Sequence, residues 1–254
     1  MENISDINIY NSGMAKSLQD KLFFMDIIGN DIDGITDYGC ADGTLLKAVS
    51  EIDPYIHLTG LDFNEDMIKL AEKNVPTAEF YTSNHVHMAG YDNILNLSSV
   101  LHEVFSYSTQ EEEKEFWADV RNGGYKYIVI RDMIYNENPI KLSKEEDVNK
   151  LFVASSHTQL ERLFEFEAIW GKVNNYKNLV HYLLKYRYVE NWNREVRENY
   201  LGYSVEDIIK NIGTDYSLIY RKDYILPFLR DKIKEDFSIE LSAPTHTNLI
   251  FKLN

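Results

Sequence analysis

A glycine-containing turn, DYGCADG at residues 37–43, follows the short apolar stretch GIT and precedes the helix-like segment TLLKAV. Glycine allows the backbone conformations that bring main-chain atoms close to a ligand. A turn of this kind between a strand and a helix commonly holds a phosphate or a nucleotide-like molecule. The turn therefore predicts an α/β fold with a ligand at the carboxyl end of its first strand.

Strand-like and helix-like segments alternate through the first half of the chain. A leading helix is expected from Asn11 or Ser12 to Gly29. Strands are expected in the segments GITDY, YIHLTGL, AEFYT, NILNLSSV and YKYIVI. The C-terminal segment FSIELSAPTHTNLIFKL is typical of two strands joined by a tight connection. This order predicts a mostly parallel sheet with one antiparallel edge strand, covered by helices.

The segment between the fifth strand and the C-terminal hairpin is expected to be helical, with capping boxes at Ser143–Glu146 and Ser156–Gln159. Three parts follow from this division. Residues 1–132 form the α/β core with its leading helix. Residues 133–236 form a helical insert between strands five and six, and residues 237–254 form a β-hairpin that completes the core sheet.

Composition disfavours two classes of protein. The formal net charge of −15 repels phosphate, so a protein that coats nucleic acid non-specifically is not expected. No stretch approaches ~18 consecutive apolar residues, the length that spans a membrane. The only cysteine, Cys40, has no partner for an intrachain disulfide, which is typical of a reducing, cytoplasmic setting.

Two common nucleotide-binding motifs match the turn poorly. A dinucleotide fingerprint requires G-x-G-x-x-G, but Ala41 and Thr44 occupy its second and third glycine positions. A P-loop requires lysine and then Ser or Thr after a glycine, which the segment GTLLK does not supply. A nicotinamide-dependent enzyme is therefore disfavoured.

The pattern acidic-x-Gly-x-Gly-x-Gly fits the turn better, with Asp37, Gly39, Ala41 and Gly43 at its four positions and Cys40 inside it. This resembles motif I of the class I S-adenosylmethionine-dependent methyltransferases. The resemblance implies that the turn lies against the methionyl part of S-adenosylmethionine, and that the acidic residue helps to hold the amino group of this cofactor. It also implies a Rossmann-like, seven-stranded sheet.

Two more positions carry the resemblance, which covers about residues 35–130. Asp62 ends the second strand, where a carboxylate can accept both ribose hydroxyls, and Phe63 can lie against the adenine. The alternative is that Asp62 and Asn64 only cap the next helix. After the third strand, Asn84 stands where the family often has an acidic residue near the adenine amino group.

Ligands of open parallel sheets bind at the carboxyl ends of the strands. Strands four and five should bring a group of polar side chains to this crevice: Ser98, Ser99, His102, Glu103, Arg131 and Asp132. We assign Ser98 to cofactor binding, and Glu103 and Arg131 to substrate binding. Methyl transfer to nitrogen or oxygen also requires that the acceptor lose a proton.

His102 is the expected general base, oriented by Asp132, and many family members carry a similar VLH element. The alternatives are that His102 only bonds to the backbone, and that Arg131 and Asp132 form a structural ion pair. His85 and His87 have metal-like spacing but no obvious carboxylate partner, so no metal is predicted.

Two segments are open to more than one interpretation. The leading helix, with Tyr10, Lys16 and Lys21, is interpreted either as a lid over the cofactor or as packing. From Gly171 to Lys234 the insert has 12 Lys and Arg against 8 Asp and Glu, with interleaved aromatics. Such a composition suits phosphate-bearing or base-bearing acceptors. It is equally typical of a helical cap with an apolar inner face.

The favoured function is a methyltransferase that uses S-adenosylmethionine and a small-molecule or nucleotide-like acceptor. One alternative is an RNA or DNA methyltransferase that binds nucleic acid through the insert. The other is a non-catalytic relative that binds the cofactor and acts as a scaffold. A membrane partner is not expected, and the sequence does not indicate the oligomeric state.

Overall fold

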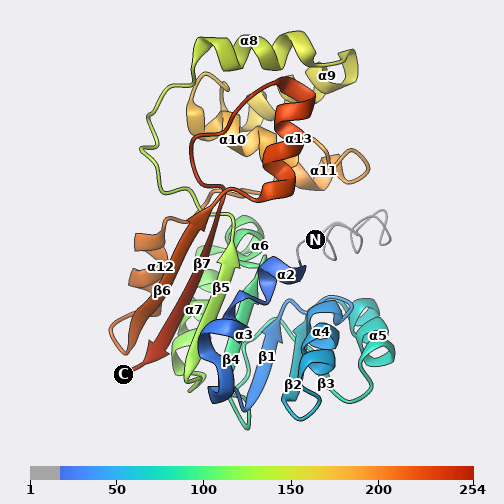
Figure 1. Cartoon of the computed structure of the whole chain (residues 1–254), viewed down its shortest axis with the longest axis vertical. Coiled ribbons are helices and arrows are strands. Elements are labelled where there is room, and N and C mark those ends of the chain that lie inside the picture. Colours follow the sequence, from blue (N-terminus) through green and yellow to red (C-terminus); the bar gives the residue numbers. More distant parts are fainter. Residues whose placement is uncertain (1–17) are drawn as a thin grey trace.

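Within residues 18–254, which are the part described by this computed structural model, seven strands form one sheet in the order β3-β2-β1-β4-β5-β7-β6 (Figure 1). The strands are β1 (Gly34–Tyr38), β2 (His57–Asp62), β3 (Glu79–Thr82), β4 (Ile94–Ser98), β5 (Tyr127–Asp132), β6 (Tyr216–Tyr224) and β7 (His246–Leu253). The pairs among β1 to β5 are parallel, whereas β7 is antiparallel to β5 and β6. The predicted mostly parallel, seven-stranded sheet with an antiparallel C-terminal strand is confirmed, but that strand lies between β5 and β6 and not at the edge.

Helices cover both faces of the sheet. They are α2 (Leu18–Lys21), α3 (Phe23–Ile28), α4 (Thr44–Ile52), α5 (Glu65–Asn74), α6 (Leu101–Tyr107), α7 (Gln110–Asn122) and α12 (Val205–Ile212), with a 3-10 turn η1 (Gly29–Asp31). One apolar layer contains Phe24 of α3 and Leu46 of α4. The opposite layer contains Trp117 of α7 and Ile208 of α12. Because β4 and β5 lie between these layers, both strands are buried along their whole length.

A helical layer lies beyond the carboxyl ends of the parallel strands (Figure 1). It consists of α8 (Glu145–Ala154), α9 (His157–Trp170), α10 (Tyr176–Lys185), α11 (Trp192–Glu195) and α13 (Pro227–Phe237). These helices share an apolar core that includes Leu163, Phe166 and Leu183. The expected insert between strands five and six is therefore present as α8–α11. None of the helices within residues 18–254 has the length and apolar character needed to cross a bilayer.

The predicted position of the sixth strand is wrong. The strand lies at Tyr216–Tyr224, inside the segment expected to be helical, and α13 occupies the connection to β7. Residues 238–245 form no strand. Phe237, Ile239 and Leu241 are buried with exposed residues between them, as in a strand, but they pack into the core of the insert. Their alternation therefore reflects packing of an irregular segment and not a hydrogen-bonded ladder.

Three of the predicted helix ends can be compared with the structure: the end of the leading helix and the starts of α8 and α9. The leading helix is present as α2 and α3 and ends before Gly29, while its expected start lies outside the described residues. The capping box at Ser156 is confirmed at the start of α9. The box expected at Ser143 is wrong, because α8 begins after Lys144 and Ser143 Oγ donates instead to Val173 O at 2.6 Å.

Candidate functional site

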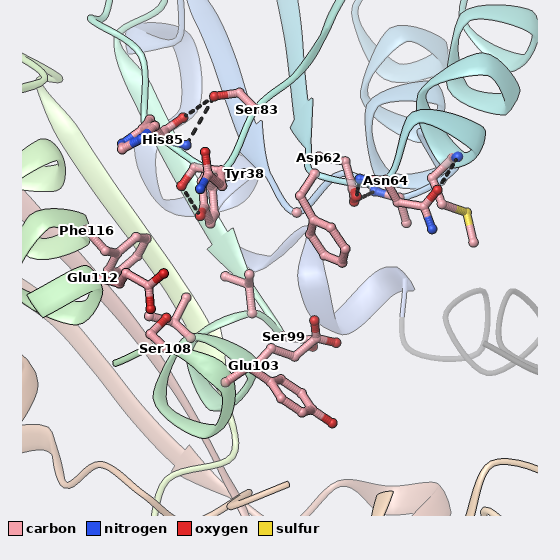
Figure 2. Close-up of a pocket in the computed structure, with 18 of the residues that line it drawn as sticks. Tyr38, Asp62, Asn64, Ser83, His85, Ser99, Glu103, Ser108, Glu112 and Phe116 are labelled. Carbon is pink, nitrogen blue, oxygen red and sulfur yellow. Dashed lines mark hydrogen bonds between the residues drawn. The ribbon is translucent and has the colours of Figure 1, made fainter. Parts of the chain in front are cut away.

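A cavity of about 330 Å³ opens at the carboxyl ends of β1, β2 and β4 (Figure 2). The strand order reverses here, because β1 pairs with β2 on one side and with β4 on the other. Ligands of doubly wound sheets bind at such switch points. The lining includes residues that the sequence assigned to ligand binding: Gly39, Ala41, Asp62, Phe63, Asn84 and Glu103.

The turn after β1 is built from left-handed residues. Gly39, Ala41 and Gly43 have φ of +77°, +47° and +77°. Gly39 N donates to Leu61 O at 2.8 Å, which holds the turn against the end of β2. A Cβ on Gly39 would lie 2.9 Å from Val100 Cγ2, so a side chain at this position does not fit. The turn therefore presents bare backbone to the cavity, as the sequence predicts.

The Asp62 carboxylate connects the turn after β1 to the start of the segment after β2. Its Oδ2 accepts a hydrogen bond from Ala41 N at 2.9 Å, and its Oδ1 accepts one from Asn64 N at 2.8 Å. Burial raises the pKa of Asp62, and these two bonds oppose that rise. Asn64 caps α5, because its side chain accepts from Asp66 N and Met67 N. Since carboxylate oxygens have further lone pairs, Asp62 can still accept hydrogen bonds from a ligand.

The wall beyond Asp62 contains an aromatic ring and a polar loop. Phe63 lines the cavity and is 48% exposed, an unusual state for a large apolar side chain. Asn84 lies on the loop after β3, and Tyr38 Oη donates to Asn84 O at 2.9 Å. This hydrogen bond fixes the loop after β3 against the end of β1.

The remaining residues assigned to the cofactor lie behind the lining. Asp37 is buried and accepts a hydrogen bond from Asn96 Nδ2 at 2.7 Å. Burial raises the pKa of Asp37 to about 6, although Asn96 and the nearby Lys21 ammonium oppose the rise. Cys40 is buried inside the turn, where burial raises the pKa of its thiol. Ser98 Oγ is buried and has no hydrogen-bond partner among the described residues.

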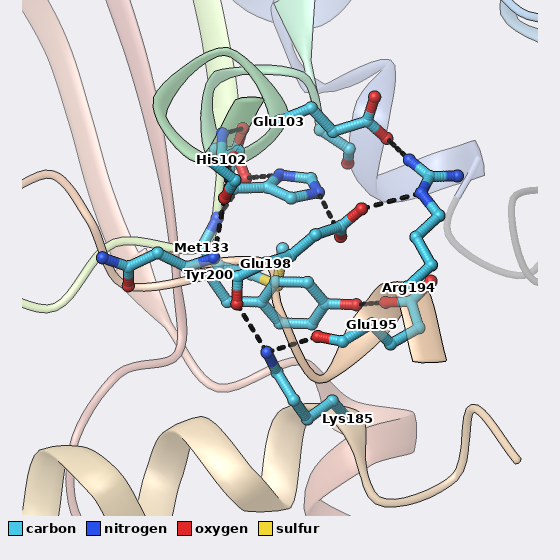
Figure 3. A network of polar contacts seen from close by, with 12 residues as sticks. His102, Glu103, Met133, Lys185, Arg194, Glu195, Glu198 and Tyr200 are labelled. Carbon is cyan, nitrogen blue, oxygen red and sulfur yellow. Dashed lines mark hydrogen bonds and ion pairs between the residues drawn. The ribbon is translucent and has the colours of Figure 1, made fainter. Parts of the chain in front are cut away.

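His102 and Asp132 are paired, as the sequence predicts. His102 Nδ1 lies 2.8 Å from Asp132 Oδ1. Asp132 Oδ2 also accepts a hydrogen bond from Leu101 N at 2.8 Å, which fixes the start of α6. The other imidazole nitrogen, His102 Nε2, lies 3.9 Å from Glu198 Oε2 of the insert (Figure 3). Neither His102 nor Asp132 is among the described residues that line the cavity.

The charge on His102 argues against a role as base. Burial alone lowers the pKa of His102, but the carboxylates of Asp132, Glu198 and Glu103 outweigh burial and raise the pKa to about 9. At neutral pH the imidazole is therefore protonated. A group that already carries its proton cannot accept another one, so this geometry favours a positioning role for His102.

Arg131 lies outside the cavity lining. Its Nε and Nη2 donate to Asp20 Oδ2 at 2.9 and 2.8 Å, and its Nη1 donates to Ser99 Oγ at 2.8 Å. Tyr224 of β6 also donates to Asp20. The alternative of a structural ion pair is therefore favoured over substrate binding, although the carboxylate in direct contact belongs to Asp20 of α2.

Glu103 of the core contacts the insert at the edge of the cavity. Arg194 of α11 lines the cavity together with Glu103, and its Nη2 donates to Glu103 Oε1 at 2.7 Å. Arg194 Nε lies 2.8 Å from Glu198 Oε1. Figure 3 shows the resulting row of alternating charges that runs from His102 through Glu198 and Arg194 to Glu103, and Asp132 extends the row beyond His102.

Sequence reasoning did not single out Arg194 or Glu198. Their spacing of four residues places them on one face of a helical turn, which was the available signal. The segment NREVRENY offers several acidic and basic residues at similar spacings. The pattern alone therefore could not show which pair reaches the core.

Comparison with known proteins shows the fold. No family model matches the chain, and no curated protein sequence matches it. Among solved structures, the methyltransferase domain of bacterial CtHen1-C is 9% identical, with a TM-score of 0.55 over 94% of this chain and 98% of that chain. A SAM-dependent methyltransferase from Anabaena variabilis ATCC 29413 is 12% identical, with a TM-score of 0.52 over 94% and 84%. The plantazolicin methyltransferase BamL is 14% identical, with a TM-score of 0.52 over 94% and 84%. The chain has the class I methyltransferase fold.

In this methyltransferase fold, the two histidines with metal-like spacing face other partners. His85 Nδ1 lies 3.1 Å from Asp119 Oδ2, and the His87 ring lies 5.3 Å from the Tyr81 ring. Within the part of the chain that the structure describes, no three His, Cys, Asp or Glu residues are grouped in a way that could hold a metal ion.

Within residues 171–234, several aromatic residues of the insert are buried, whereas most of the Lys and Arg residues are exposed. Leu179, Val180, Leu183 and Leu184 belong to its buried core, as the helical-cap alternative predicts, and Tyr182, Tyr186 and Trp192 lie in the same core. Lys185 is fully buried, and its Nζ donates to the backbone oxygens of Glu195 and Glu198 at 2.7 and 2.6 Å. The Lys185 charge is therefore not part of a surface patch, whereas Arg187 and Arg197 of the same insert are exposed.

The possible lid residues are only partly described. Tyr10 and Lys16 lie outside the described residues. Lys21 is buried on α2, where burial and the nearby Arg131 charge lower its pKa to about 8. Asp37 lies near enough to oppose this shift. Lys21 therefore lies near the buried carboxylate of Asp37, which is behind the residues that line the cavity.

Proposed function

We propose that this chain is an S-adenosylmethionine-dependent methyltransferase that acts on a nitrogen or oxygen nucleophile of a small-molecule acceptor. The observation that carries the proposal is the hydrogen bond from Ala41 N to Asp62 Oδ2 at 2.9 Å. It joins the motif I turn and the acidic end of β2 at one cavity, on the switch point of a methyltransferase-like sheet.

The residues present fit this cofactor. A cavity of about 330 Å³ falls within the range of small-molecule sites, which is roughly 300–1,000 Å³. Gly39 and Ala41 line the cavity with little side chain, so a ligand can approach the backbone of the turn. Ser98 Oγ is a buried hydroxyl behind the lining without a partner among the described residues, and such a group is expected to bond to an ordered water.

The proposed roles follow from these positions. Asp62 would hold the ribose hydroxyls, Phe63 would lie against the adenine, and Asn84 would contact the adenine amino group. Asp37 and Ser98 would lie at the methionyl end. The bound cofactor supplies an electrophilic methyl group on a sulfonium. The contribution of the chain is to align an acceptor with that methyl group, which is where most of the rate enhancement of such a displacement arises.

Two further observations support an enzyme. BamL, which shares the fold, was solved in complex with a triazolic desmethylPZN analog and SAH. The cavity is open beside Glu103 and Arg194, whereas a scaffold protein is expected to have the crevice filled by its own side chains.

Calorimetric titration tests the proposal. We expect S-adenosylhomocysteine and S-adenosylmethionine to bind the wild-type chain. Asp62→Ala should weaken both by tenfold or more, because each hydrogen bond to a charged group contributes about 1.5–3 kcal/mol. Asp66→Ala is the control, since this exposed carboxylate on α5 contacts Lys69. Absence of binding to wild type would refute the proposal, and binding without transfer in a screen of metabolites and nucleotides would favour the scaffold.

A further inference from the structure

The acceptor end of the cavity can be located from the order of the strands. Asp62 ends β2, and β1 and β4 follow it across the sheet. The turn after β1 contributes Gly39 and Ala41, and the segment after β4 contributes Val100 and Glu103. A ligand whose ribose lies at Asp62 and whose chain lies along the turn therefore directs its reacting group toward the β4 side. This is also where the insert reaches the cavity through Arg194.

Glu103 is the carboxylate at that end. It lies on α6, and 18% of its side chain is exposed. Its oxygen Oε1 accepts a hydrogen bond from Arg194 Nη2 at 2.7 Å. Burial raises the pKa of Glu103, and the Arg194 charge opposes that rise. Glu103 thus combines access to the cavity with an affinity for a proton that is greater than that of an exposed glutamate.

Three charged side chains of the same network do not meet both conditions. Asp62 meets them, but it lies at the other end of the cavity, where the ribose is proposed to bind. His102 is protonated at neutral pH and lies behind the lining. Glu198 is buried and lies 2.8 Å from Arg194 Nε. Arg194 is a cation and cannot act as a base.

The charge of the lining favours one class of acceptor. Glu112 and Glu115 of α7 line the same cavity as Glu103 and Asp62, and Arg194 is the one Lys or Arg in the described lining. A carboxylate or phosphate on the acceptor would be repelled by this majority of acidic groups, whereas an ammonium would be attracted.

We propose that Glu103 binds a cationic amine acceptor and takes its proton, an inference that rests on the methyltransferase function proposed above. The ammonium R–NH₃⁺ gives a proton to the Glu103 carboxylate. The nitrogen lone pair then forms a bond to the methyl carbon, and the carbon–sulfur bond breaks with its electron pair on sulfur. The products are R–NH₂⁺–CH₃, S-adenosylhomocysteine and a protonated Glu103, which returns its proton to solvent.

A pair of cofactor analogues tests this role without knowledge of the acceptor. Sinefungin carries a primary amine on the carbon that replaces the sulfur and its methyl group, whereas S-adenosylhomocysteine has a neutral thioether there. Calorimetry gives the ratio of their dissociation constants. We expect Glu103→Gln to weaken sinefungin binding about tenfold relative to S-adenosylhomocysteine, which corresponds to about 1.4 kcal/mol. Glu111→Gln, an exposed carboxylate on α7, is the matched control.

The outcomes separate the two proposals. A ratio unchanged by Glu103→Gln, or an equal loss of both ligands, would overturn the role of Glu103. Failure of both ligands to bind wild type would refute the methyltransferase function itself.

A pH series on the wild-type chain tests the same role and avoids any folding defect of the variant. As the pH falls and Glu103 gains a proton, sinefungin should lose affinity relative to S-adenosylhomocysteine, and a ratio independent of pH would also overturn the proposal.

Discussion

Glu198 Oε2 lies 3.9 Å from His102 Nε2, and this contact joins the helical insert to the core. On its other side His102 meets Asp132, so the imidazolium is held between carboxylates from two parts of the chain. Burial opposes ionisation of Asp132, but the His102 charge and hydrogen bond lower its pKa below the usual range. A carboxylate of the core and a carboxylate of the insert therefore share the charge of His102.

His102→Gln should remove a contribution to stability that depends on pH. The pKa of His102 is raised from 6.5 to about 9 in the folded chain, so the charged form stabilises fully below about pH 6.5. This contribution is lost as the pH rises through 9. The difference in unfolding free energy between wild type and His102→Gln should shrink by roughly 2–3 kcal/mol between about pH 6 and pH 10.

Urea unfolding at several pH values measures this difference. His157→Gln is the control, since this histidine is exposed and its Nε2 lies 3.4 Å from Glu161 Oε1. A difference that stays constant with pH would show that folding does not raise the pKa of His102, which would leave the imidazole mostly neutral above about pH 7 and restore it as a candidate base.

Asp20→Asn should destabilise the packing of the leading helix on the sheet. Arg131 is buried and its guanidinium donates twice to Asp20. Removal of one partner of a buried ion pair leaves an uncompensated charge, and we expect a loss of about 2–4 kcal/mol in the free energy of unfolding. Asp26→Asn on the exposed face of α3 should change stability by less than about 0.5 kcal/mol. Equal effects in urea unfolding would contradict the structural role of the pair.

The parts of the site that sequence predicts are those made within a short segment. The turn from Asp37 to Gly43 and the Asp62–Asn64 segment each contain the residues that determine their own geometry. Glycine supplies the left-handed conformation, and Asn64 supplies the cap of α5. These features therefore follow from the type and spacing of neighbouring residues.

The ion pairs of the site could not be predicted from the sequence, because they join segments that are distant along the chain. Arg131 meets Asp20 across 111 positions, and Arg194 meets Glu103 across 91 positions. The charge of His102 follows from the carboxylates of Asp132, Glu198 and Glu103, so the sequence suggested a base where the structure places a cation. The sixth strand was missed for a related reason. Most of its residues are exposed, so it carries no alternating apolar pattern, and its place in the sheet is set by pairing with β7.

Gly39→Ala should abolish tight cofactor binding because of its neighbour and not because of its backbone conformation. Gly39 and Gly124 have φ of +77° and +78°, so alanine is strained at both positions. Only the Cβ at position 39 meets another side chain, Val100 Cγ2 at 2.9 Å, whereas a Cβ on Gly124 meets nothing within 4 Å. Both variants should lose about 1–2 kcal/mol of stability. Gly39→Ala alone should weaken S-adenosylhomocysteine by tenfold or more in calorimetry, and equal affinities of the two variants would contradict this assignment.

Ala41→Gly should stabilise the chain and keep the site intact. Ala41 has φ of +47°, in the left-handed region that costs a non-glycine residue about 1–2 kcal/mol. Glycine removes that cost but gives the unfolded chain more freedom, which returns about 0.4–1 kcal/mol. The net gain of about 0.5–1 kcal/mol should raise the midpoint of thermal unfolding by roughly 1–4 °C. Because the hydrogen bond to Asp62 uses the backbone N–H of residue 41, affinity for S-adenosylhomocysteine should be retained. A lower midpoint would show that the methyl group of Ala41 contributes packing that outweighs the strain.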